Sequence, residues 1–380
     1  MRQTKTFIAL VVLTVVAVGA AMWSQTPDTP AASRGDPVFP GLLDKVNDVR
    51  TISVRSAEAA LTIAAQGDGW VVKEKASYPA ETDEVRALIV GAGELKRVEP
   101  KTAKADFFAK LELEDPGEGK ESIGYTLKDG NGGEIAAIIV GKRRILSSSV
   151  SSDQYYVRVP SEDRAWLVEG LIPKHRVATD WLKSTIVGID TERVHRTTVW
   201  HPDGTVVRAV KAAPGDANFA LMGLAPGQEI DSDYNVHALA TTLGDLSLND
   251  VTTIDAVDFS KPGIRVVLET FDGLVIELKS GAKGKDVFFR LNARVDDATP
   301  KLLGIESGMT DEKGDELRKK ALAAVKSVDD VRTEADKYNA DWQGWAYRVP
   351  TYNLESMSKR IEDLVKPEKK DAVPNLLKGG

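Results

Sequence analysis

Residues 194–210, VHRTTVWHPDGTVVRAV, decide the fold of this chain. Two runs rich in β-branched residues, 194–200 and 206–210, stand on either side of Pro202-Asp-Gly204. Pro, Asp and Gly between two such runs are typical of a tight turn that joins neighbouring strands. The stretch therefore predicts a β-hairpin, and with it an antiparallel sheet.

The elements that follow this hairpin continue the sheet and add one helix. Val236, Leu239, Ala240 and Leu243 recur at helical spacing and predict a helix over residues 233–243. A second hairpin is predicted across Asp272-Gly273. The further strands expected here cover residues 219–222, 264–271, 274–279 and 287–291.

The first half of the chain shows the same order of elements, so the sequence predicts an internal repeat. A helix is expected over residues 83–95, with Val85, Leu88 and Ile89 on one face. A hairpin is expected at Asp129-Gly-Asn-Gly-Gly133. The strands predicted in this copy cover residues 49–55, 61–64, 70–75, 122–128, 134–140, 144–148 and 155–159.

The last strand of the second copy is displaced along the sequence. Residues 345–350, WAYRVP, match residues 155–160, YYVRVP, and an insertion at 296–344 precedes them. A charged amphipathic helix is predicted over residues 311–337 at the centre of this insertion. Helices are also expected after both Val-Pro pairs, over residues 162–171 and 354–365.

These patterns predict an α+β protein with two tandem units, each a mostly antiparallel sheet with a helix on one face. The first unit is expected over residues 42–185. The second is expected over residues 186–366, and a loose tail over residues 367–380 follows it.

The N-terminus carries an uncharged apolar run, residues 7–23, behind Arg2 and Lys5. Its seventeen residues would extend roughly 26 Å as a helix, close to the short limit for crossing a bilayer. Residues 1–23 are therefore predicted to be either an uncleaved transmembrane anchor or a signal peptide cleaved after about Ala20 or Ala21. The Pro-rich residues 24–41 are expected to be a disordered linker.

Charge and composition restrict location and function. The cations before the apolar run predict a cytoplasmic N-terminus and an exported body, which in a bacterium means a single-pass protein of the inner membrane with a periplasmic body. A net charge of -7 argues against a nucleic-acid-binding protein, because such proteins carry an excess of positive charge. The chain has no cysteine, which excludes disulfides, thiolate metal sites and a lipid-modified cysteine.

No motif indicates catalysis, and no catalytic, cofactor-binding or metal-binding residue is predicted. The four histidines, His175, His195, His201 and His237, have no metal-ligand spacing. The glycine-rich stretches at Gly117 and Gly281 lack the framework of a phosphate-binding loop. A hydrolase of envelope polymers remains an alternative, which would need a cleft of converging carboxylates or histidines.

Aromatic residues at the end of the insertion are the candidate partner-binding site. Trp342, Trp345 and Tyr347 border the insertion, and aromatic side chains are enriched in protein interfaces. The alternative is that these rings fill the core. The insertion itself is interpreted either as a docking element or as a solvated lid over the sheet.

Several stretches together resemble the bacterial domain-of-unknown-function family 4340. They are Trp70, Tyr78-Pro79-Ala80, Asp83, Leu88 and Leu95, then residues 108–116, the strands near Asp129-Gly130, and Tyr155-Tyr-Val-Arg158. The resemblance covers about residues 45–350, although residues 108–116 lack the glycine that the family commonly has there. The family implies a membrane-anchored auxiliary protein of ABC-type transport systems of the gliding-motility kind, with no catalytic residues to carry over.

The expected function is therefore that of a non-catalytic extracytoplasmic accessory protein. Its expected partners are an ABC transporter permease and its ATPase, and its small-molecule ligand is unknown. The alternative is a free periplasmic binding or cell-envelope maintenance module that is released by signal cleavage.

Overall fold

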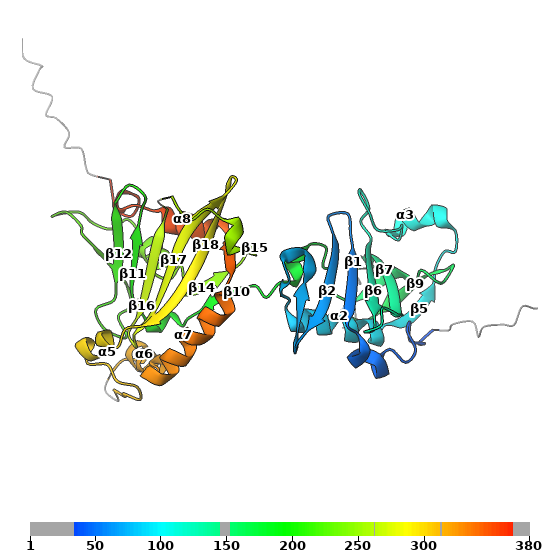
Figure 1. Ribbon diagram of the computed structural model, residues 1–380, viewed down its shortest axis with the longest axis horizontal. Helices are drawn as coiled ribbons and strands as arrows, with labels where there is room; N and C mark the ends of the chain where they lie inside the picture. Colours follow the sequence, from blue (N-terminus) through cyan, green and yellow to red (C-terminus); the bar gives the residue numbers. More distant parts are fainter. Residues whose placement is uncertain (1–33, 145–152, 262, 312–313, 368–380) are drawn as a thin grey trace, which may run out of the picture. The chain divides into compact units, whose positions relative to one another are not determined.

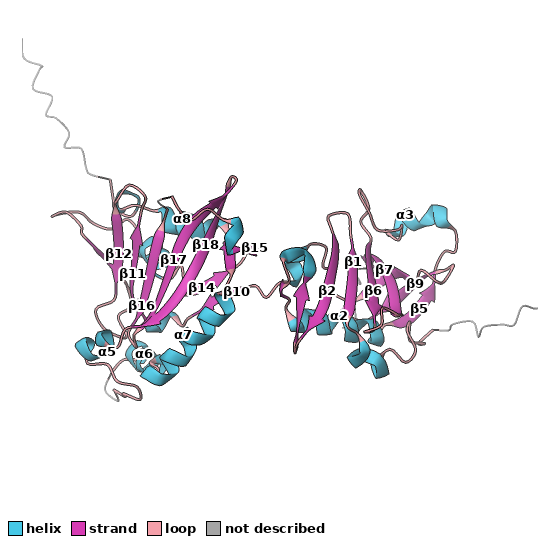
Figure 2. Cartoon of the chain, in the orientation of Figure 1, coloured by secondary structure: helices cyan, strands magenta, loops and turns pink. Residues whose placement is uncertain are grey.

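The computed structural model describes residues 34–144, 153–261, 263–311 and 314–367. Contacts divide the chain into two compact units, residues 1–62 with 83–176 and residues 63–82 with 177–380. Figures 1 and 2 show large sheets accompanied by helices. The predicted combination of large antiparallel sheets and helices is confirmed.

The first sheet has nine strands in the order β4-β3-β2-β1-β6-β7-β8-β9-β5. Helix α2, Thr82–Glu94, and the short helix α3, Phe108–Leu111, accompany it. The strands are β1 Thr51–Arg55, β2 Ala60–Gln66, β3 Gly69–Val72, β4 Tyr78–Pro79, β5 Lys96–Pro100, β6 Ile123–Lys128, β7 Glu134–Arg144, β8 Gln154–Arg158 and β9 Ala165–Glu169.

Helix α2 forms where the sequence predicts a helix. Its buried residues Val85, Leu88, Ile89 and Ala92 follow helical spacing and lie on one face. Asp83 and Glu84 lie in its first turn, where negative charge interacts favourably with the helix dipole.

Two predictions in the first half of the chain are wrong. The disordered linker predicted over residues 24–41 is wrong for its last residues, because Gly35 and Val38 donate hydrogen bonds to the carbonyl groups of Arg97 and Leu95 at 2.7 and 2.9 Å, and residues 24–33 lie outside the described residues. The helix predicted over residues 162–171 is strand β9. Four of its five residues are buried, so the strand lacks the alternation that distinguishes a half-buried strand from a helix.

The second sheet has eight strands in the order β13-β12-β11-β16-β17-β18-β19-β15. A two-stranded ribbon, β10 Thr185–Gly188 with β14 Asp245–Ser247, lies in the same unit. The strands of the sheet are β11 Val194–Trp200, β12 Val206–Val210, β13 Ala220–Met222, β15 Asp250–Thr253, β16 Arg265–Thr270, β17 Leu274–Lys283, β18 Asp286–Val295 and β19 Trp345–Arg348.

Helix α4, Asp233–Ala240, packs on β11 and β12 and covers one face of the second sheet. Thr197 points to this side, because its hydroxyl donates to the Ala240 carbonyl at 2.5 Å. The residues of opposite parity, such as Arg196 and Trp200, form the other face, which we call the open face. The hairpins predicted across Pro202-Asp-Gly204 and Asp272-Gly273 are both present.

The two sheets share one order of strands. When β4 is left out, the first sheet has the order β3-β2-β1-β6-β7-β8-β9-β5. The second sheet has the corresponding order, with β13 in the place of β3, β12 in the place of β2, and so on to β15 in the place of β5. The predicted match of residues 345–350 with 155–160 is wrong in this frame. Strand β19 lies between β18 and β15, as β9 lies between β8 and β5, so β19 takes the position of β9 and not of β8.

Residues 296–344 connect β18 to β19 and contain helices α5 Ala298–Leu303, α6 Glu316–Ala324 and α7 Val328–Trp342. The single helix predicted over residues 311–337 is wrong. The chain leaves helical geometry at Val325, and Ser327 caps α7 by accepting a hydrogen bond from the Asp330 amide at 3.2 Å.

Helix α8, Thr351–Ser358, follows the second sheet, and it is shorter than the helix predicted over residues 354–365. The chain then forms the 3₁₀ helix η7, Ile361–Asp363. The other 3₁₀ helices are η1 Leu43–Asp48, η2 Lys73–Lys75, η3 Ala105–Phe107, η4 Ala178–Trp181, η5 Thr191–Arg193 and η6 Ile254–Ala256.

The predicted anchor, residues 1–23, lies outside the described residues, as does nearly all of the predicted tail. Among the residues that the structure describes, no helix has the length and apolar character needed to cross a membrane.

Candidate functional site

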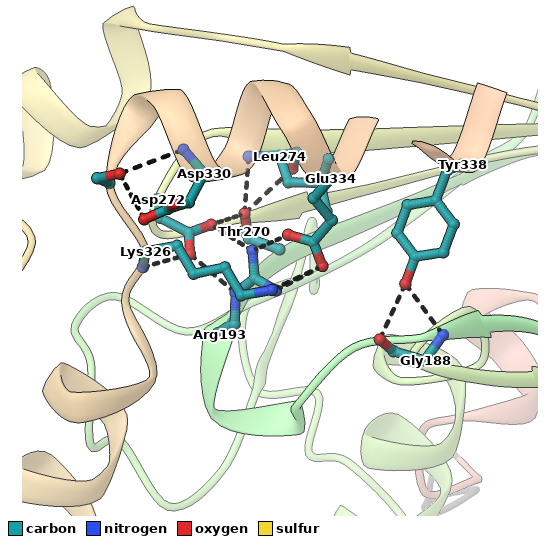
Figure 3. A network of polar contacts seen from close by, with 10 residues as sticks. Gly188, Arg193, Thr270, Asp272, Leu274, Lys326, Asp330, Glu334 and Tyr338 are labelled. Carbon is teal, nitrogen blue, oxygen red and sulfur yellow. Dashed lines mark hydrogen bonds and ion pairs between the residues drawn. The ribbon is translucent and has the colours of Figure 1, made fainter. Parts of the chain in front are cut away.

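A buried ion network fixes the start of helix α7 (Figure 3). Arg193, at the end of η5, is only 2% exposed. Its Nε lies 2.8 Å from the Asp272 carboxylate, and one of its terminal nitrogens lies 2.8 Å from the Glu334 carboxylate. Asp272 belongs to the turn between β16 and β17, whereas Glu334 lies on α7. The network therefore joins the sheet to the insertion.

Each charge of this network is compensated. Asp272 also accepts hydrogen bonds from the Lys326 amide at 3.0 Å and from the Thr270 hydroxyl. Burial acts to lower the pKa of Arg193, but hydrogen bonds to Glu334 and Asp272 outweigh it and raise the pKa, so the guanidinium stays charged. Gly273 permits the tight turn beside Asp272, since its φ is +90° and a Cβ there would lie 2.4 Å from the Asp296 carbonyl oxygen.

The second half of α7 is fixed by side chains that bond to backbone groups. The Asn339 amide accepts from the Ala293 amide and donates to its carbonyl, both at 2.8 Å. Ala293 lies in β18 beyond the single residue pair that joins β18 to β19. The Tyr338 hydroxyl bonds to both the amide and the carbonyl of Gly188, which ends β10. Helix α7 is thus held to β18 and to β10.

The three aromatic residues predicted as a partner-binding site lie close together in the chain but differ in exposure. Trp342 is buried, stacks on Tyr338 at 4.8 Å, and donates from Nε1 to the Ile186 carbonyl at 3.0 Å. Tyr347 is also buried, at 1% exposure. Trp345 is half-buried. The burial of Trp342 and Tyr347 leaves little ring surface for a partner, and partner binding at these residues stays a prediction.

Trp345 borders a hollow with a volume of about 870 Å³. The hollow lies between the end of α7 and strands β17 and β18. Its lining is mostly polar on the sheet side and is supplied by Ile254, Glu277, Lys279, Arg290, Leu291, Asn292, Asn339, Ala340, Trp342, Gln343, Gly344 and Trp345. This volume lies in the range of small-molecule binding sites.

The polar groups of the hollow suit binding more than proton transfer. Burial acts to raise the pKa of Glu277, but hydrogen bonds from Arg265 and Lys279 outweigh it and lower the pKa, so the group stays a carboxylate and is a weak base. Asn292 and Gln343 offer amide donors and acceptors. Within the described ranges, no group of three or more His, Asp or Glu side chains is placed to hold a metal ion.

The histidines occupy separate positions. His175 bonds to Glu84 at 2.7 Å, and His195 bonds through Nδ1 to the Lys211 carbonyl at 2.8 Å. His237 lies on α4 with its ring 5.8 Å from that of Phe219. His201 is buried in the turn after β11.

Sequence reasoning missed both the ion network and the polar floor of the hollow. Arg193, Asp272 and Glu334 are far apart in the chain, and no local pattern signals their meeting. The floor did carry a signal, because Glu277 and Lys279 alternate with buried residues along β17, as Arg290 and Asn292 do along β18.

The structure thus defines a protein with two large antiparallel sheets and a polar hollow beside helix α7. A family model described as a domain of unknown function, DUF4340, matches residues 70–263. The match covers half of the chain, so the protein belongs to the DUF4340 family. No curated protein matches the chain. No solved structure matches it either.

Proposed function

We propose that the protein is a non-catalytic, membrane-anchored accessory protein of an ABC-type transport system, with its body on the extracytoplasmic side. The uncharged run of residues 7–23 behind Arg2 and Lys5 supports the anchor and its orientation. The transporter is suggested by the family resemblance. Its permease and ATPase are the proposed partners.

The observation that carries a binding role is the rigid attachment of α7 beside the hollow. Three charged side chains leave water to fix one end of this helix, and Asn339 and Tyr338 fix the other. Binding sites need a surface whose geometry is held by supporting contacts. Helix α7 therefore presents its outer side chains, among them the exposed Arg332, Asp336 and Lys337, in a constant arrangement.

We also infer that the two sheets are copies of one duplicated module. The common strand order supports this, as does a helix in each copy, α2 between β4 and β5 and α4 between β13 and β14. Only the second copy carries the helical connection of residues 296–344. A duplicated module leaves one copy free to acquire a new surface, and the insertion is the proposed docking element.

Membrane topology can be tested directly because the chain has no cysteine. Tyr234→Cys places a thiol at a position that is 77% exposed. A membrane-impermeant maleimide applied to spheroplasts should label Tyr234→Cys and should not label Lys5→Cys until the membrane is opened. Labelling of Lys5→Cys alone in sealed spheroplasts would contradict the proposed orientation.

Partner contact can be tested with a photo-crosslinking residue at Lys337, on the exposed side of α7. The matched control carries it at Arg86, which is exposed on α2. The proposal expects a permease adduct at Lys337. Equal adducts at both positions, or none at Lys337, would remove the insertion as the docking element.

The second candidate is a free periplasmic binding module, and the hollow of about 870 Å³ favours it. It requires cleavage after about Ala20 or Ala21. N-terminal sequencing of the mature protein separates the two, since an intact Met1 or Arg2 supports the anchored protein.

A further inference from the structure

Three cations lie side by side across the open face of the second sheet. The strand register pairs Arg265 of β16 with Lys279 of β17, and Lys279 with Arg290 of β18. Adjacent strands are about 4.8 Å apart, so the three side chains leave the sheet within roughly 10 Å of one another. Like charges in directly opposed positions destabilise a sheet. An anion bound beside the row would reduce the repulsion among these three side chains.

The protein compensates only part of this charge. Glu277 accepts from Arg265 and lies 3.0 Å from the Lys279 ammonium group. Arg290 is exposed, and its guanidinium lies 5.0 Å above the Phe259 ring. Among the described residues, no carboxylate forms an ion pair with Arg290. One negative charge thus faces three positive ones on a protein whose net charge is -7.

A small pocket opens over this row, with a volume of about 210 Å³. Its walls include Phe259, Lys261, Arg265, Lys279 and Arg290. Lys261 adds a fourth cation, although Asp258 lies 4.0 Å from it. The Ile264 amide donates to the Ser280 hydroxyl at 2.8 Å, which ties the loop before β16 to β17. The pocket is too small for a whole drug-sized ligand but suits one anionic group.

The small pocket adjoins the larger hollow, because Lys279 and Arg290 line both. The hollow adds the amides of Asn292 and Gln343, which can hydrogen-bond hydroxyl groups. Arginine side chains bind phosphate through paired N–H donors, and lysine binds it as a point charge. The arrangement therefore offers a cationic end and a polar end for one ligand.

We propose that this cleft binds the phosphate group of a phosphorylated, hydroxyl-rich ligand, with the phosphate between Arg265, Lys279 and Arg290 and the remainder in the larger hollow. The site stands on the second sheet alone and does not depend on the proposed transporter partner. The phosphate has two possible sources, a soluble sugar phosphate or a phospholipid headgroup.

Calorimetric titration of the full-length protein in phosphatidylcholine nanodiscs tests the site, with glucose 1-phosphate as the probe and glucose as its uncharged counterpart. We expect saturable binding of glucose 1-phosphate that weakens as salt is raised, and at least tenfold weaker binding of glucose. Arg290→Gln should reduce the affinity for glucose 1-phosphate about 10- to 100-fold, since a hydrogen bond to a charged group is lost.

Two further variants make the test specific. Arg208→Gln is the matched control, because Arg208 is an exposed arginine of β12 whose side chain bonds to Thr198 outside the cleft. It should leave the affinity within twofold of the parent protein. Glu277→Gln should tighten binding, since it removes the one carboxylate of the row. Equal thermal unfolding of Arg290→Gln and Arg208→Gln shows that folding is not the cause.

The outcomes decide the proposal. No saturable binding of glucose 1-phosphate, or equal losses in Arg290→Gln and Arg208→Gln, would overturn it. Nanodiscs with phosphatidylglycerol identify the source of the phosphate: weaker binding of glucose 1-phosphate there indicates that headgroups occupy the cleft, and unchanged binding indicates a soluble ligand. Both results support a phosphate site.

Discussion

At the scale of residues, the second unit contains a buried ion network of Arg193, Asp272 and Glu334. Removing a charge from water costs several kcal/mol, and the network offsets this only because every member has a partner. The side chains of Arg193 and Asp272 are 2% and 1% exposed. Loss of one partner would leave an uncompensated charge in the interior.

Arg193→Met should therefore destabilise the second unit by about 3–5 kcal/mol, because buried Asp272 loses its ion-pair partner and Glu334 keeps only the Lys326 ammonium group at 3.0 Å. Denaturant unfolding followed by tryptophan fluorescence measures this. Arg332→Ala is the control, since Arg332 pairs with Asp329 on the exposed side of α7 and should change stability far less. Similar losses in both variants would show that the network does not hold the helix.

Stability should fall on mild acidification through the histidines. Burial lowers the pKa of His195 below its ordinary value of 6.5, although its bond to the Lys211 carbonyl and the nearby Glu269 act in the other direction. Burial also lowers the pKa values of His201 and His237. The unfolded chain then binds more protons, so the stability is complete above about pH 6.5 and is lost as the pH falls toward the folded-state pKa values.

The measurement is the denaturation midpoint of the full-length protein between pH 7.5 and 5.5. The midpoint should decrease across this range, and His195→Asn should show a shallower decrease. A midpoint that is constant across the range, or a slope unchanged in His195→Asn, would contradict this assignment.

At the scale of elements, α7 takes the place of a strand along part of β18. Strand β19 is paired with β18 only at Phe289 and Tyr347, so the backbone groups near Ala293 would face an open edge. Asn339 bonds to both the amide and the carbonyl of Ala293, as a neighbouring strand would. Covering an edge in this way prevents pairing with other chains.

Asn339→Ala should cost about 1–3 kcal/mol, because two backbone groups of Ala293 lose their partner. Faster amide hydrogen exchange at residues 291–295 should accompany the loss, while residues 265–270 of β16 should keep their protection. Unchanged exchange at residues 291–295 would show that α7 does not protect this edge.

Elements with strong local signals could be predicted from the sequence. Elements that depend on burial or on contacts with distant residues could not. The hairpins at Gly204 and Gly273 and helix α2 follow from turn residues and helical spacing. Strand β9 was missed because both of its faces are buried. The break between α6 and α7 depends on Ser327 as a cap and on the bond from the Lys326 amide to Asp272, a residue 54 positions away.

The same reasoning applies to the candidate site. Trp345, which the sequence predicts for partner binding, lines the hollow, but the sequence could not show that Trp342 and Tyr347 are buried. The cationic row of Arg265, Lys279 and Arg290 depends on the register of three strands. Each strand shows the alternation, but only the fold aligns the three residues.

At the scale of the whole molecule, we propose a duplicated α+β module on a membrane anchor, and the helical connection of residues 296–344 occurs in the second sheet alone. The common order of strands supports the duplication. The membership of the DUF4340 family agrees with the resemblance in the sequence. The accessory role in transport is the central proposal.

Affinity purification of the tagged full-length protein from native membranes in mild detergent tests this claim most directly, with mass spectrometry of the co-purifying proteins. We expect recovery of an ABC permease and its ATPase, and a reduced yield from a variant in which the exposed α7 residues Arg332, Asp336 and Lys337 are replaced by alanine. Recovery of the protein alone, or in the soluble periplasmic fraction, would contradict it.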